Sequence, residues 1–268
     1  MTGLNEPQTG DPVDAVEEMI EPAVPERLAW LAGLLDAHPG ERIVDLGCGT
    51  GSALEMIAER LDVGIVGFDS SGAVLRTAAR ALGALPHARL LLAQADLTHP
   101  IPLAEASVDR ALCHNVLECL ADPAELVADA HRILRPGGRL VLSHSDFDTM
   151  LFASEDLELT RRLVRSYCDT QQDWMDAVDG TIGRRLVEIV GRSPLRVDDV
   201  QARANLSLRF QPGELGYAYA HNLAGSLRAS GTVDPAELDG WLAGLRRLGA
   251  RGAFLFSVND YAVVATRH

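Results

Sequence analysis

Residues 43–51 read Ile43-Val44-Asp45-Leu46-Gly47-Cys48-Gly49-Thr50-Gly51, and they are the most informative stretch of this chain. A short apolar run ends in an acid and a loop with three glycines at alternate positions, and a helical pattern begins directly afterwards. Glycine permits sharp turns and lets a ligand approach the backbone closely. The first N–H groups of the next helix point into the same space, so a polar ligand can bind there. The stretch therefore predicts the strand, glycine loop and helix that begin a nucleotide-type α/β site.

The spacing of the glycines distinguishes this loop from two related ones. A dinucleotide loop has the pattern G-x-G-x-x-G and a phosphate loop has G-x-x-x-x-G-K-[ST], whereas this chain has G-x-G-x-G and contains no lysine. The acid at Asp45 would repel a pyrophosphate and suits a cationic ligand. A tight turn between an ordinary strand and helix is the alternative interpretation of the loop taken alone.

Length and composition exclude several functions. The chain has 268 residues, 47% of them hydrophobic, which is enough for one sizeable core and a lid. Its net charge of −14 argues against binding to nucleic acid or to an anionic membrane surface. The four cysteines are scattered and form no C-x-x-C pair, so we expect reduced thiols, no metal site and a cytoplasmic protein. We expect no signal sequence and no membrane-spanning segment.

Strand and helix patterns alternate from residue 41 onward and predict an α/β fold with a doubly wound, mostly parallel sheet. The expected strands are Arg42–Leu46, Gly64–Phe68, Ala88–Ala93, Val108–Cys113, Arg139–Ser143, Arg196–Leu208 and Phe254–Thr266. After residue 145 we expect a long helix over 154–178 and another over 181–190. The expected organisation is an N-terminal helical cap (1–40), a ligand-binding core (41–145), a helical insertion that forms a lid (146–192) and the rest of the sheet with its helices (193–268).

Five stretches of the chain, in the same order, resemble motifs of the class I S-adenosylmethionine-dependent methyltransferases. They are Asp45-x-Gly47-x-Gly49-x-Gly51, Asp69 after the second strand, Asp96 after the third, residues 108–118 and residues 132–140. The resemblance implies a Rossmann-like sheet of seven strands, with an antiparallel last strand between the fifth and the sixth. It also implies S-adenosylmethionine as the cofactor. The match is strong over about half of the chain, and the C-terminal half agrees only in outline.

The resemblance also implies roles for individual residues in binding the cofactor. Asp45 would favour its positively charged amino-acid end, and the N–H groups around Gly47 and Gly49 would bind its carboxylate. Asp69 would accept hydrogen bonds from the ribose, and Asp96 would bind the adenine amino group. The full set of expected cofactor-binding residues is Asp45, Gly47, Cys48, Gly49, Gly51, Asp69, Ser70, Asp96, Leu97, His114 and Asn115.

Methyl transfer depends on alignment of the reacting groups, and an acceptor that carries a proton also needs a base. His114, after the fourth strand, is the first candidate for that base, and the alternative is a histidine that only shapes the pocket. Glu118 either orients His114 or is a solvated helix residue. His144 and Asp146 at the end of the fifth strand form a second acid–base candidate pair, or a polar strand end that satisfies its own backbone.

Polar and aromatic residues of the C-terminal half are the candidates for binding the acceptor. They are Asp148, Tyr167, Trp174, Tyr217 and His221. Ten acids lie between Asp146 and Arg192, and an acidic lid with aromatic residues would suit an amine. A solvated helix face explains the same charges.

We therefore predict a methyltransferase that acts on a nitrogen or an oxygen of a small molecule, as a monomer or homodimer. A natural-product acceptor rests on family analogy alone. A methyltransferase for peptide or protein side chains is one alternative, and a non-catalytic nucleoside-binding protein is another. Acceptor-dependent formation of S-adenosylhomocysteine distinguishes an enzyme from a binding protein.

Overall fold

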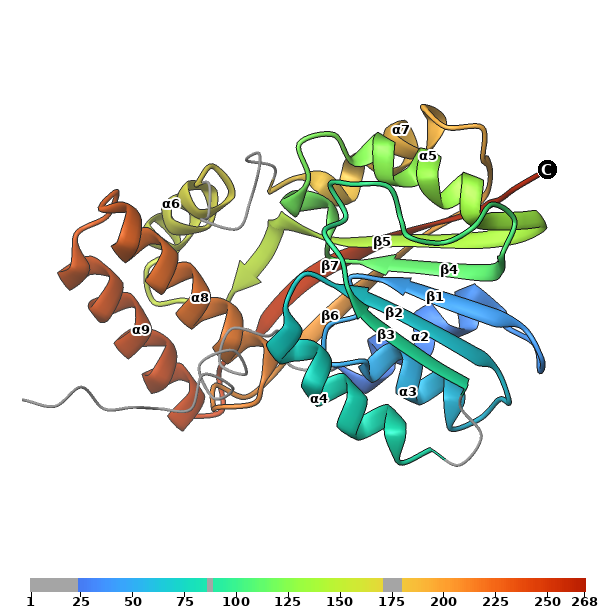
Figure 1. Ribbon diagram of the computed structural model, residues 1–268. Coiled ribbons are helices and arrows are strands. Elements are labelled where there is room, and N and C mark those ends of the chain that lie inside the picture. Colours follow the sequence, from blue (N-terminus) through green and yellow to red (C-terminus); the bar gives the residue numbers. More distant parts are fainter. Residues whose placement is uncertain (1–23, 86–88, 171–179) are drawn as a thin grey trace, which may run out of the picture.

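The computed structural model describes residues 24–85, 89–170 and 180–268. Its centre is a seven-stranded sheet in the order β3-β2-β1-β4-β5-β7-β6 (Figure 1). Strands β1 to β5 are parallel, and β7 runs antiparallel to both β5 and β6. This arrangement confirms the predicted doubly wound sheet with its antiparallel last strand. The strands are β1 (Arg42–Leu46), β2 (Gly64–Asp69), β3 (Arg89–Gln94), β4 (Val108–His114), β5 (Leu134–Phe152), β6 (Arg196–Ser207) and β7 (Phe256–Thr266).

Helices cover both faces of this sheet because its strands are apolar on both sides. Ile43 of β1 packs toward α2 (Pro25–Leu35), α3 (Ser52–Ala58) and α4 (Gly72–Gly83) on one face. The next residue, Val44, packs into the core on the opposite face, beneath α5 (Pro123–Ile133) and α7 (Ile182–Gly191). The two helical layers lie below and above the sheet in Figure 1. Alternation along β1 thus serves two cores at once, which is typical of a buried parallel strand.

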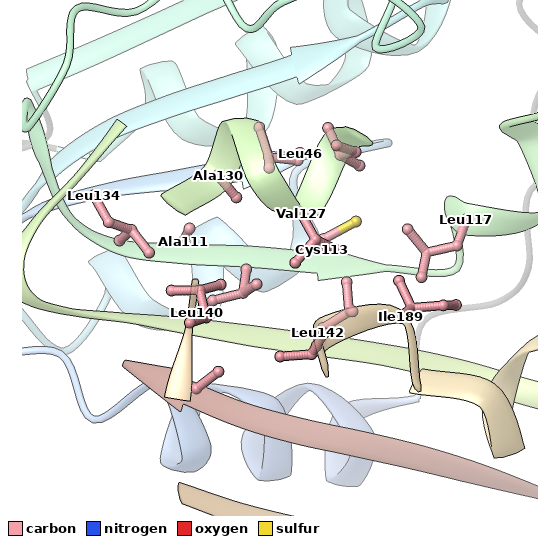
Figure 2. Packing of buried hydrophobic residues seen from close by; sticks show 14 of the residues in the cluster. Leu46, Ala111, Cys113, Leu117, Val127, Ala130, Leu134, Leu140, Leu142 and Ile189 are labelled. Atoms are coloured by element: carbon pink, nitrogen blue, oxygen red, sulfur yellow. The ribbon is translucent and has the colours of Figure 1, made fainter. Parts of the chain in front are cut away.

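The core under α5 and α7 fixes the strands that carry the candidate site. Figure 2 shows side chains of β1, β4 and β5 packed against the two helices. The residues labelled there are Leu46, Ala111, Cys113, Leu117, Val127, Ala130, Leu134, Leu140, Leu142 and Ile189, and each of them is almost fully buried. This packing sets where β1, β4 and β5 end, and therefore where their polar end residues meet.

A third group of helices forms a separate cluster, which we call the cap and which is not the N-terminal segment 1–40 predicted as a helical cap. It consists of α6 (Leu157–Cys168), α8 (Leu215–Ser230) and α9 (Pro235–Ala250), at the left of Figure 1. Its core includes the rings of Phe152 and Trp241, whose centroids lie 5.2 Å apart. Helix α7, expected as part of the 146–192 lid, packs instead on β5, β7 and α5. We therefore propose α6, α8 and α9 as the unit that covers the acceptor site.

Strand β5 is much longer than the predicted Arg139–Ser143. It continues to Phe152 because β7 pairs with it up to Asp146 and again at Leu151 and Phe152, with an irregularity between Asp146 and Leu151. The helix predicted over 154–178 ends at Cys168, and residues 171–179 lie outside the described ranges. Within the described residues, each helix is too short or too polar to cross a membrane.

Candidate active site

The glycine loop, residues 47–51, leaves the carboxyl end of β1 as predicted. Its three glycines have φ angles of +83°, +53° and +82°, a region that L-residues with side chains rarely adopt. A Cβ on Gly47 would lie 2.2 Å from Cγ2 of Val116, so this glycine lets the segment after β4 pack directly on the loop. A Cβ on Gly49 would meet no atom within 4 Å. Gly49 therefore borders open space, as a ligand-binding loop requires.

Asp69, at the end of β2, supports the glycine loop from the neighbouring strand. The N–H of Gly49 donates to its Oδ2 at 3.0 Å, and the N–H of Ser71 donates to its Oδ1 at 2.9 Å. Each carboxylate oxygen keeps a further lone pair for a ligand hydroxyl. Ser70, between the two contacts, is exposed. Asp69 and Ser70 thus lie where the ribose role was predicted, and that role stays a proposal.

Asp45 is a buried carboxyl group whose pKa is strongly raised. It is only 4% exposed on β1, directly before the loop. Burial, followed by the nearby charge of Asp69, raises the pKa of Asp45 to about 7. A buried carboxylate without a cation beside it is costly, so a positively charged ligand at this point would stabilise its ionised form.

Asp96 and Leu97, predicted to bind adenine, follow β3 in an exposed turn. Oδ1 of Asp96 accepts hydrogen bonds from the backbone N–H of Thr98 at 2.9 Å and from its hydroxyl at 2.7 Å. These hydrogen bonds lower the pKa of Asp96. Leu97 packs against the core and lines a groove of about 500 Å³ beside the start of α5. The local contacts of Asp96 explain its place in the turn, and its contact with adenine stays a prediction.

His114 ends β4 at the carboxyl edge of the sheet. Both of its ring nitrogens are buried, and neither has a hydrogen-bond partner among the described residues. Burial, the charge of Arg27 on α2 and the charge of His144 together hold the pKa of His114 well below its usual range. The ring is therefore neutral near pH 7 and has a lone pair available to accept a proton.

His144, the second predicted base, is fully buried and already has partners for both ring nitrogens. Nδ1 contacts the carbonyl oxygen of Ser145 at 2.7 Å, and Nε2 contacts a carboxylate oxygen of Glu118. No ring nitrogen is left for a substrate, so this geometry argues against a catalytic role. The prediction that Glu118 is solvated is wrong, because Glu118 is buried and pairs with His144 rather than with His114.

Asp146 does not form an acid–base pair with His144. It is fully buried, and both of its carboxylate oxygens accept hydrogen bonds from the guanidinium of Arg184 on α7, at 2.6 and 2.7 Å. Asp148, proposed for acceptor binding, is exposed and contacts the same guanidinium at 3.1 Å. Arg184 thus ties the end of β5 to α7, which gives both acids a structural explanation.

The sequence analysis missed a buried polar network on the opposite face of β5. The hydroxyl of Ser145 donates to Oδ1 of Asp260 at 2.6 Å, and the Asn205 amide donates to Oδ2 at 2.7 Å. Arg27 lies 3.8 Å from the same carboxylate, and the hydroxyl of Tyr219 donates to Oγ of Ser145 at 3.4 Å. The network joins β5, β6, β7, α2 and α8 next to His114. The sequence signal that could have revealed this network is Asp260, a charged residue within the otherwise mostly apolar last strand.

Of the aromatic acceptor candidates in the described ranges, the structure brings only Tyr167 toward the strand ends. Its ring lies 5.9 Å from that of Phe147 on β5, measured between centroids. Tyr217 and His221 stack on each other at 3.9 Å and pack on Phe210. Tyr219, on another side of α8, contacts β5 in their place. Trp174 lies outside the described residues.

Most of the described acids of the 146–192 segment are paired with arginines. Glu155 contacts Arg247 at 2.7 Å, and Glu158 contacts Arg161 at 2.7 Å. Asp146 and Asp148 share Arg184, as above. Paired carboxylates offer little to a cationic acceptor, so this charge pattern supports ion pairing on the surface over recognition of an amine.

Comparison with known proteins gives the same fold and motifs. A methyltransferase domain family matches residues 44–142. An uncharacterised 37.1 kDa protein in a transposon of Streptomyces fradiae is 31% identical over 265 residues, which cover 92% of this chain and 73% of that protein. The 27-O-demethylrifamycin SV methyltransferase of Amycolatopsis mediterranei is 35% identical over 42% of this chain and 41% of its own length.

A solved structure from Bacillus halodurans, described as a candidate methyltransferase, shares the fold. Its TM-score is 0.61 with 15% identity, and the match covers 90% of this chain and 99% of that one. At this identity the likeness concerns the fold alone. The methyltransferase domain match over residues 44–142 includes the glycine loop, Asp69 and His114.

Proposed function

Because the chain belongs to the class I S-adenosylmethionine-dependent methyltransferases, we propose that it transfers a methyl group to an oxygen atom of a small-molecule acceptor. The observation that carries this proposal is the neutral imidazole of His114, whose nitrogens have no partner among the described residues. A hydroxyl acceptor must lose its proton, and a neutral imidazole is suited to take it. The rifamycin relative, named for an O-demethylated compound, agrees with oxygen as the acceptor atom.

The residues around the glycine loop fit S-adenosylmethionine. Open space borders Gly49, Asp69 offers carboxylate lone pairs beside it, and the buried Asp45 favours a cation. We propose that Gly47 and Gly49 approach the amino-acid part of the cofactor and that Asp69 holds the ribose. When bound, the cofactor supplies a methyl group on a sulfonium, a good leaving group. Alignment of the acceptor then contributes most to catalysis, about 7–11 kcal/mol for well-oriented reactions.

In the proposed reaction, His114 starts neutral and accepts the acceptor's hydroxyl proton on a ring nitrogen. The acceptor O–H bond would break as the new O–C bond forms, and the methyl–sulfur bond of the cofactor would break with its electron pair left on sulfur, so no free alkoxide would have to accumulate. Burial, and after it the charges of Arg27 and His144, keep the imidazole unprotonated beforehand. Because the ring nitrogens are buried in the ligand-free protein, acceptor binding must displace the groups that cover them.

Oxygen is favoured over nitrogen because the described acids of the lid segment are largely occupied. Arg184, Arg161 and Arg247 neutralise acids that an amine acceptor would otherwise meet. We also propose that the protein is a monomer or homodimer and that it is cytoplasmic. We propose no nucleic-acid partner, because a net charge of −14 opposes binding to phosphates.

A panel of acceptors tests the proposed function. The protein is incubated with S-adenosylmethionine and matched pairs of small molecules that differ only in a hydroxyl or an amino group, and the products are identified by mass spectrometry. We expect methylation of hydroxyl acceptors and coupled formation of S-adenosylhomocysteine. Methylation restricted to amines would contradict the choice of oxygen, and binding without turnover of any acceptor would contradict the enzyme.

Asp45 should make cofactor binding dependent on pH. Its pKa of about 7 in the ligand-free protein means that a cationic cofactor, which favours the carboxylate, releases a proton when it binds below that pH. We expect the affinity for S-adenosylmethionine to rise about tenfold between pH 6 and pH 8. Calorimetry in buffers of different ionisation enthalpy measures both the affinity and the proton release, and Asp45→Asn should abolish the pH dependence.

The same group changes the stability of the ligand-free protein in a defined direction. A carboxyl group whose pKa is raised on folding stabilises the fold at low pH, and this contribution is lost as the pH rises from about 4 to about 7. The shift corresponds to about 4 kcal/mol. Asp45→Asn should therefore raise the free energy of unfolding at pH 8 while it weakens cofactor binding. Equal stability of both proteins at pH 8 would contradict the raised pKa.

A further inference from the structure

A buried contact between Glu118 and His144 joins the segment after β4 to β5. Glu118 belongs to a short 3-10 helix, η1 (Leu117–Cys119), and His144 lies on β5, 26 residues further along the chain. Both are shielded from solvent. Neither side chain is explained by apolar packing, and His144 has no nitrogen left for a substrate.

The geometry of His144 and the charge of Glu118 together favour the imidazolium form of His144. Nδ1 lies 2.7 Å from a carbonyl oxygen, and Nε2 contacts a carboxylate oxygen, so both nitrogens face acceptors. A neutral imidazole has one N–H, whereas an imidazolium has two. Burial opposes protonation, but the charge of Glu118 and its hydrogen bond outweigh burial and raise the pKa of His144. The same pairing lowers the pKa of Glu118 against the effect of its burial.

The segment that Glu118 holds in place, residues 114–118, carries His114 and contacts the glycine loop. The N–H of Asn115 donates to the carbonyl oxygen of Ser143 at 3.1 Å, and its side-chain oxygen accepts from the N–H of Ser145 at 2.9 Å. Asn115 has a φ of 51°, an unusual value that these contacts maintain. Val116 then packs on Gly47. The segment is thus fixed to β5 at two points, Asn115 and Glu118, on either side of Val116.

We propose that Glu118 and His144 form a buried ion pair that positions residues 114–118 against the glycine loop, so that the pair controls cofactor binding and methyl transfer without touching either ligand. The inference rests on the proposed function for its effect on turnover, but not for its effect on binding. Loss of a supporting contact that lets a site loosen by about 1 Å can lower turnover about 10²-fold.

The charged groups around the two histidines act in opposite directions. The negative charges of Glu118 and Asp260 raise the pKa of His144, whereas the positive charges of Arg27 and His144 lower the pKa of His114. Removal of the Glu118 charge should therefore leave His144 neutral. The ring of His144 reports this change directly, because the nitrogen shifts of an imidazolium differ from those of a neutral imidazole.

The test compares Glu118→Ala, Glu118→Gln and the control Glu125→Gln, an exposed glutamate on α5. Nitrogen NMR of the histidine rings at pH 7.5 should show charged His144 in the unaltered protein and neutral His144 in Glu118→Gln. Glutamine keeps the shape and one hydrogen bond, so this variant should bind S-adenosylhomocysteine within about threefold of the unaltered protein. Glu118→Ala should bind it about tenfold more weakly. Glu125→Gln should change neither property.

Several outcomes would overturn the proposal. One is a neutral His144 in the unaltered protein, and another is a charged His144 in Glu118→Gln. The third is a folded Glu118→Ala with unchanged affinity for S-adenosylhomocysteine, because a merely structural pair would lower the melting temperature alone.

Val116→Ala provides a second test if Glu118→Ala does not fold. It removes the contact between the positioned segment and Gly47, so it should weaken binding of S-adenosylhomocysteine similarly, and unchanged affinity rejects the inference. Turnover of the acceptor found in the panel should fall about 10²-fold in Glu118→Ala. A failed panel would reject the proposed function and leave the binding and NMR results intact.

Discussion

Gly49→Val should abolish binding of S-adenosylhomocysteine, with a loss of about 100-fold or more. The residue has a φ of +53°, which a β-branched side chain adopts only with strain. Its Cβ would meet no protein atom within 4 Å, so the new side chain would project into the space proposed for the cofactor. The backbone N–H that reaches Asp69 would also be disturbed. Calorimetry at pH 7.5 measures the loss, which corresponds to about 2.7 kcal/mol or more.

Gly137→Val is the matched control for backbone strain. Gly137 has a φ of +81°, and a Cβ there also meets no atom within 4 Å, but it is an exposed residue near the start of β5, at the end of that strand away from the glycine loop. Both variants should lose stability to a similar extent, and only Gly49→Val should lose binding. If Gly49→Val binds as tightly as Gly137→Val, the space beside Gly49 does not hold the cofactor.

Local patterns in the sequence predicted the first half of the sheet closely. β1 has the predicted bounds Arg42–Leu46, and β2, β3 and β4 differ from prediction by one residue at one or both ends. Each of these strands has a short apolar stretch bounded by polar or turn residues, so hydrophobic content and length are sufficient to find it. The glycine loop was equally clear, because its left-handed φ angles require glycine.

The outer part of β5 could not be predicted because its signal is tertiary. His144, Ser145 and Asp146 are polar, which is typical of a strand end, yet all three are fully buried. Their partners lie far away in the sequence, on η1, β7 and α7. Periodicity indicates which residues share a face, but not which distant groups satisfy them.

In the cap, too, periodicity shows which residues share a helix face but not what that face contacts. Tyr217 and His221 are four residues apart and share one face of α8, while Tyr219 lies on another. The spacing is visible in the sequence, but the choice of the face that meets β5 depends on the packing of α8 between α6 and α9. Similarly, charge counts in the 146–192 segment could not show that arginines from α7 and α9 pair with its acids.

His114→Leu should separate catalysis from stability. With the base removed, turnover of a hydroxyl acceptor should fall about 10²- to 10⁴-fold. Affinity for S-adenosylhomocysteine should stay within about threefold, because Asp69 and the glycine loop remain. The ligand-free protein should be as stable as before, or more stable by about 1 kcal/mol, since leucine replaces two buried nitrogens that have no partner among the described residues. Denaturant unfolding and steady-state kinetics measure the two effects on one preparation.

His38→Phe is a suitable control, because His38 is exposed in the turn before β1, at the opposite end of that strand from the glycine loop. The pH profile adds an independent check on His114 itself. Burial, Arg27 and His144 hold its pKa well below the usual value, so turnover measured at saturating S-adenosylmethionine, where the titration of Asp45 no longer limits binding, should remain undiminished as the pH falls to 6.5 and should decline only below it. A decline centred above pH 6.5 would mean that another group is the base. Loss of stability in His114→Leu would mean that the ring nitrogens have partners, and that this histidine is held for the fold rather than for the acceptor proton.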